Sequence, residues 1–83
     1  MTDTVLVQIW MPICLERFDL EASLLADAGD LLVKCMLWVS EQKGMSMQSE
    51  GHFFCNPRTK EIIRKGNTLS DTEVVRGDLL IIF

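Results

Sequence analysis

Only one stretch of this 83-residue chain carries the signals of a helix, and its place between strand-like segments most constrains the fold. Asp27 is a suitable N-cap, and Asp30 places a second carboxylate in the first turn, where the helix dipole favours it. Lys43 and Gly44 form a typical helix ending. Between these ends, apolar residues follow helical spacing at Leu31, Leu32, Cys35, Trp38 and Val39. The sequence therefore predicts one helix over residues 27–44, with one stripe facing the core.

Two strand patterns precede this helix. Residues 5–11 are rich in β-branched and aromatic side chains and stop at Pro12. Their alternation predicts a strand with one apolar face, formed by Val5, Val7, Ile9 and Met11. Residues 14–21 alternate Phe18 and Leu20 with charged side chains, which is typical of a half-buried strand. The short join at 12–13 predicts a β-hairpin.

The chain after the helix predicts three more strands. Residues 45–51 show no period and predict a loop, and strands are expected over 52–55, 61–64 and 79–83. Turn-forming residues separate them at 56–60, 65–67 and 76–78, and a crossover at 68–71 continues into a helical turn over 72–75. We therefore predict an α+β fold of order β-β-α-β-β-β. One helix packs across a mixed sheet of four to five strands, and residues 1–83 form one domain.

The bulk composition excludes several classes of protein. Hydrophobic residues make up 48% of the chain, too many for a disordered segment. The net charge of −4 argues against nucleic acid as a partner, because phosphate binding needs an excess of Lys and Arg. No apolar run approaches the roughly 20 residues of a spanning helix, so we expect no membrane insertion. An odd number of cysteines and no basic N-terminal signal region favour a reducing, cytoplasmic location.

Short motifs across nearly the whole chain indicate a family. Strand two contains Phe18-Asp19-Leu20, and Glu50-Gly51-His52-Phe53 precedes the third strand. Leu69-Ser70-Asp71 is followed by Gly77-Asp78 before the last strand. In this layout Leu69 and Val74 can fill the core, and Gly77 permits a turn with positive φ. The chain resembles the β-grasp, or ubiquitin-like, proteins, and within them the YukD/EsaB family of bacterial type VII (WXG100) secretion systems.

This resemblance implies a ubiquitin relative that is not conjugated to other proteins. Conjugation needs a flexible tail ending in Gly-Gly, whereas this sequence ends at Phe83 inside its last predicted strand. The resemblance implies an accessory or regulatory module that binds another protein. Its partner would be a membrane-associated component of the secretion system. One alternative is a small β-grasp subunit of a multicomponent monooxygenase. A modifier or sulfur carrier is a third reading, which requires a longer gene product.

No pattern indicates an enzyme, a metal or a cofactor. Cys14, Cys35, Cys55 and His52 lack the close cysteine pair that structural zinc sites show, so buried free thiols are the simpler interpretation. His52 and Cys55 are three residues apart, so on one strand their side chains would point to opposite faces. The acidic pairs suit helix capping and solvation.

The predicted helix leaves a second apolar face, which we interpret as a surface for binding a protein. Val33 and Leu37, with Met36, lie opposite the core stripe. Leu24, Leu25, Leu6 and Trp10 are candidates to extend this surface. A homodimer is the simplest partner, although scattered exposed apolar residues are also common.

A basic cluster is expected around the turn between the third and fourth strands. It comprises Arg58, Lys60, Arg64 and Lys65, with only Glu61 of opposite sign. In an acidic chain such a cluster could dock an acidic segment of a partner. The alternative is a solvated hairpin whose charges protect strand edges. The predicted partner-binding residues are therefore Val33, Met36, Leu37, Arg58, Lys60 and Arg64.

Overall fold

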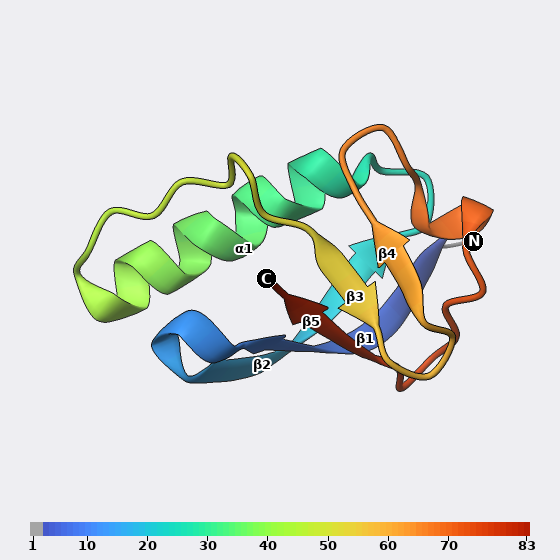
Figure 1. Cartoon of the computed structure of the whole chain (residues 1–83), viewed down its shortest axis with the longest axis horizontal. Coiled ribbons are helices and arrows are strands. Elements are labelled where there is room, and N and C mark those ends of the chain that lie inside the picture. The colour runs from blue at the N-terminus through green and yellow to red at the C-terminus, as the bar shows by residue number, and fades with distance from the viewer. Residues whose placement is uncertain (1–2) are drawn as a thin grey trace.

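The computed structural model describes residues 3–83 and contains one helix lying across a sheet of five strands (Figure 1). A hairpin comes first, then the helix, then three short strands. The elements are β1 (Thr4–Met11), the 3-10 turn η1 (Pro12–Cys14), β2 (Glu16–Ser23), α1 (Ala28–Lys43), β3 (Phe54–Asn56), β4 (Glu61–Ile63), the 3-10 turn η2 (Leu69–Asp71) and β5 (Leu79–Ile82).

The sheet has the strand order β2-β1-β5-β3-β4, so the last strand lies in the middle. β1 pairs with β2 in antiparallel register, and with β5 in parallel register. β3 is antiparallel to both β4 and β5. This is a mixed five-stranded sheet with a single helix on one face, and the predicted β-grasp arrangement is confirmed.

The core lies between α1 and the face of the sheet that we call the inner face. Strand alternation buries Val7, Ile9 and Met11 on β1, as the sequence predicts. The helix contributes Leu31, Leu32, Cys35, Met36 and Val39 to this core. Leu69, in the turn η2, is also fully buried there. Val74 packs against this cluster, so both residues expected to fill the core from the crossover do so.

Both predicted helix ends are confirmed. Asp27 is the N-cap, and its Oδ2 accepts a 2.7 Å hydrogen bond from the amide of Gly29. Its other oxygen accepts one from the amide of Gly66, also at 2.7 Å, which joins the helix start to the turn after β4. Gly44 ends the helix in the left-handed conformation at φ 67°. A single carboxylate therefore fixes where the helix begins and what lies beside it.

Several predicted boundaries shift. β2 begins at Glu16 because Leu15 adopts φ 55°, which closes the hairpin turn. β3 runs over Phe54–Asn56, starting two residues later than expected. The helical turn of the crossover is Leu69–Asp71, so the prediction of a turn over 72–75 was wrong. The hydroxyl of Thr72 donates instead to the carbonyl of Leu69 at 2.7 Å and caps that earlier turn.

Trp38 departs from its predicted place in the core stripe. Its side chain is 40% exposed, and its ring lies 4.5 Å from that of Phe18, centroid to centroid. Phe18 is on β2, which is an edge strand and only half covered by the helix. The indole therefore packs on the rim of the core, beside an apolar depression lined by Leu20 and Cys35.

Candidate interaction surfaces

The outer face of α1 exposes two apolar side chains one turn apart. Val33 is 43% exposed and Leu37 is 58% exposed, as the sequence predicts. Met36 is only 2% exposed, so its placement on this surface was wrong. It points into the core and contributes the floor of a shallow depression of about 310 Å³, whose rim includes Val33, Leu37 and Met47. We call Val33, Leu37 and Met47 the helix face.

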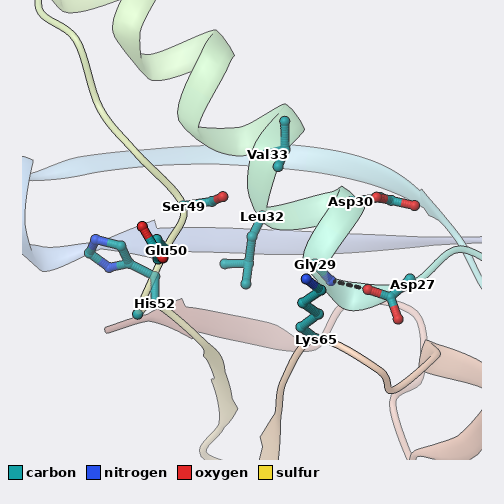
Figure 2. A pocket seen from close by; sticks show the side chains of 10 residues that line it. Asp27, Gly29, Asp30, Leu32, Val33, Ser49, Glu50, His52 and Lys65 are labelled. Atoms are coloured by element: carbon teal, nitrogen blue, oxygen red, sulfur yellow. Dashed lines mark hydrogen bonds between the residues drawn. The ribbon is translucent and has the colours of Figure 1, made fainter.

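A second depression, of about 560 Å³, adjoins the helix face at its N-terminal end and shares Val33 with it. Figure 2 shows Asp27 and Lys65 beside the first turn of α1, with Glu50 and His52 across from them on the segment that leads to β3. Carboxylates and cationic groups are mixed here. Within residues 3–83, no group of His, Cys, Asp and Glu side chains is arranged to hold a metal ion.

The expected extensions of the helix face lie elsewhere. Leu24 packs against the core, and Leu25 is 66% exposed before the helix begins. Leu6 and Trp10 alternate with the buried residues of β1, so they point away from α1 on the outer face of the sheet. The hypothesis that they extend the helix face was therefore wrong, because the sheet itself separates the two surfaces.

A buried carboxylate pairs with one member of the predicted basic cluster, Arg58, and so sets it apart from the others. Asp78 is 6% exposed, and its Oδ1 accepts a 2.8 Å hydrogen bond from Nε of Arg58. Its Oδ2 accepts hydrogen bonds from Nη2 of Arg58 at 2.9 Å, the amide of Val75 at 2.9 Å and Nδ2 of Asn56 at 3.1 Å. The Arg58 guanidinium holds the pKa of Asp78 well below its usual range, while Asp78 raises that of Arg58. Arg58 thus braces the turn, and its charge is matched within the chain.

The other two predicted basic residues are accessible but are not brought to the helix face. Lys60 is exposed in the turn between β3 and β4, where it adopts φ 63°. The Arg64 guanidinium lies 5.3 Å from the ring centre of Phe53. In Figure 1 the turn between β3 and β4 and the helix α1 lie at opposite sides of the view. The predicted set therefore divides into separate regions.

A surface that sequence reasoning missed runs across the outer face of the sheet. Strand register aligns Trp10 on β1 with Ile81 on β5, Ile81 with Cys55 on β3, and Cys55 with Ile62 on β4. All four alternate with buried neighbours, so they share the face that α1 does not cover. The result is an apolar row across four adjacent strands, which we call the sheet row.

Aromatic residues widen the sheet row at one side. Phe53 and Phe83 form two main-chain hydrogen bonds next to the pairing of β3 with β5. The amide of Phe83 donates to the carbonyl of Phe53 at 3.0 Å, and the amide of Phe53 donates to the carbonyl of Phe83 at 3.2 Å. Their rings lie 6.0 Å apart. Arg17 of β2 ends the row, with its guanidinium 5.2 Å from the ring centre of Trp10. Strand alternation alone could have indicated this surface, but only the register shows that the outward residues adjoin one another.

The three thiols and the single histidine lie in different surroundings. Burial raises the pKa of Cys35 to about 12, so its thiol stays protonated. Nδ1 of His52 lies 2.8 Å from the carbonyl oxygen of Phe83 and donates to it. Cys14 and Cys55 are free and half buried. Among residues 3–83, no helix has both the length and the apolar character to span a bilayer.

The comparisons with known proteins establish the fold. No family model matches the sequence, and no curated protein matches it. A structure described as molecular mimicry of SUMO that promotes DNA repair matches 100% of this chain and 94% of its own, with TM-score 0.73 and 12% identity. An N-terminal ubiquitin-like domain solved in solution matches 100% of this chain and 76% of its own, with TM-score 0.70 and 11% identity.

A third neighbour is the ubiquitin-like domain of an Arabidopsis thaliana protein. It matches 99% of this chain and 78% of its own, with TM-score 0.71 and 11% identity. At such low identity the neighbours specify an architecture and not an activity. By its structure, the chain has the β-grasp fold of ubiquitin-like domains.

Proposed function

We propose that this chain is a non-catalytic protein-docking module, serving in the cytoplasm as an accessory component of a bacterial type VII secretion system. The observation that carries the docking role is the helix face. Val33 and Leu37 are large apolar side chains left open on the outer face of α1, whereas Trp38, also 40% exposed, packs on Phe18 at the rim of the core. Beside them lies a depression with an apolar floor formed by Met36. Such a surface suits an apolar side chain of a partner.

The assignment to a secretion system rests on the YukD/EsaB resemblance. The residues that carry it have structural roles in this fold. Phe18 packs on Trp38, Leu69 is fully buried, and Asp78 braces the turn between β3 and β4. Their roles support the shared fold more than a shared partner. The free state of all three cysteines agrees with a reducing cytoplasm.

The helix face gives the proposal a direct test. The double substitution Val33→Glu with Leu37→Glu places charge where apolar contact is expected. We expect about a hundredfold loss of partner affinity, because burying two such side chains contributes about 3 kcal/mol or more. The matched control is Gln42→Glu with Ser46→Glu, which adds the same charge at exposed polar positions next to the helix end. The control variant should bind like the native chain.

Affinity capture from the native cell, followed by identification of the bound proteins, measures the outcome. Recovery of a type VII secretion component by the native and control chains, and its loss with the double variant, supports the proposal. Recovery of hydroxylase subunits instead would favour the monooxygenase alternative. Equal capture by all three chains would overturn the docking role of the helix face.

A further inference from the structure

The sheet row is a second apolar surface, on the opposite side of the molecule from the helix face. Ile62 is 53% exposed, and Trp10 and Ile81 are half buried, with no helix or strand of residues 3–83 packed over them. Phe83, beside the row, is also 53% exposed. Aromatic and aliphatic side chains at the centre with charged residues around them are typical of protein interfaces. The proposed docking function does not use this surface.

Charged residues lie at both edges of the row: Arg17 stands over Trp10 at one level of β2, and one pairing step away a carboxylate on the β2 side lies opposite a cation on the β4 side. On the β2 side, Asp19 and Glu21 alternate with half-buried neighbours and share the outer face. Asp19 aligns with Gln8 of β1, which aligns with Leu79 of β5. Extending the antiparallel registers of β3 with β5 and with β4 beyond their last pairs brings Leu79 level with the turn after β3, which carries Lys60. Because Asp78 matches the charge of Arg58, Lys60 is the free cation of that turn among the described residues.

The strand order makes these charges self-complementary. β5 is the middle strand, with β1 and β2 on one side and β3 and β4 on the other. A two-fold axis between two stacked sheets, parallel to their strands, superimposes β5 on β5 and places β2 of each copy over β4 of the other. Asp19 then faces Lys60 of the second copy, and the contact occurs twice. Aligned sheets normally pack in this way, about 10 Å apart.

We propose that the sheet row is the interface of a homodimer, in which two copies of this chain stack outer face to outer face. Ile81 lies at the centre of this interface, and Trp10 of each copy packs over the β3 side of the other. The helix faces remain open on the two outer sides of the dimer. The assembly would therefore offer two identical docking sites to a partner, which raises its avidity.

Sedimentation equilibrium of the purified chain tests the interface. The native chain should have twice the monomer mass of 9.4 kDa. Asp19→Lys and Lys60→Asp should each weaken the dimer by about tenfold or more, since each places like charges opposite one another. The double variant Asp19→Lys with Lys60→Asp should regain most of the native affinity, because it restores opposite charges with their signs exchanged.

Two further variants complete the test. Ile81→Asp should give a monomer, and Ile62→Asp serves the same purpose at an exposed position should the first variant fail to fold. The chain carrying Val33→Glu with Leu37→Glu should remain a dimer. This result would show that the dimer interface and the helix face are different surfaces. A native chain that stays monomeric up to about 1 mM, a missing charge-exchange rescue, or a monomer produced by the helix variant would each overturn the proposal. A monomeric native chain or a missing rescue would overturn the dimer and leave the docking role of the helix face to be judged by partner capture.

Discussion

The helix face and the sheet row are both apolar and exposed, but they arise in different ways. The helix face comes from residues that break the amphipathic pattern of α1, at Val33 and Leu37. The sheet row keeps strict strand alternation, and its apolar character comes from the residues chosen for the outward positions. A surface on a helix can thus be found as an exception to a pattern. A surface on a sheet must be found by aligning strands that are distant in sequence.

The largest effect we expect is a difference in the free energy of unfolding between variants of two neighbouring residues of α1. Met36 is 2% exposed and Leu37 is 58% exposed, although both are apolar. Met36→Ala should lower the free energy of unfolding by about 3 kcal/mol, as large-to-small core substitutions do. Leu37→Ala should change it by less than about 0.5 kcal/mol, as expected for an exposed site. Chemical denaturation measures both values, and similar losses would mean that the helix is wrongly oriented.

A smaller effect is expected at the buried carboxylate that braces the edge of the sheet. Asp78→Ala leaves Asn56 and the Val75 amide without their acceptor. We expect a loss of about 2 kcal/mol, below the roughly 3–5 kcal/mol of fully buried pairs, because the Arg58 side chain is half exposed. Lys60→Ala, in the turn between β3 and β4 that also carries Arg58, is the control, because the Lys60 side chain has no such role in the network. If both variants are equally stable, the Asp78 network does not support the fold.

The same carboxylate predicts how stability depends on pH. The pKa of Asp78 is lowered in the folded chain by Arg58, so the unfolded chain binds a proton more readily. Its contribution is therefore fully present above the ordinary aspartate pKa, about 3.9, and is lost as pH falls through the lowered value. Denaturation midpoints between about pH 5 and pH 2 should fall more steeply for the native chain than for Asp78→Asn. Parallel curves would contradict this.

The fold was largely predictable because its signals are local. The caps at Asp27 and Gly44 and the alternation of β1 can be seen within a few residues of sequence. The site was predicted only in part. Met36 was placed on the wrong face because its angular position on the helix lies close to the border of the core stripe. Arg58 was counted as free because its partner Asp78 is 20 residues away, and no local pattern indicates such a pair.

Chemical labelling of introduced thiols tests most directly whether two opposite faces bind two different occupants. In a chain carrying Cys14→Ser and Cys55→Ala, which keeps the sheet row apolar, the remaining Cys35 is buried and its raised pKa, about 12, keeps it unreactive. Val33→Cys and Ile62→Cys then report on the helix face and on the sheet row separately. Maleimide labelling rates are compared in the purified chain and in the native cell.

We predict that Ile62→Cys is already protected in the purified chain, because the second copy covers it. Val33→Cys should label rapidly there and become protected only in the native cell, where the partner is present. A Val33→Cys thiol that labels equally fast in both settings would contradict the central claim that the outer face of α1 is a docking surface.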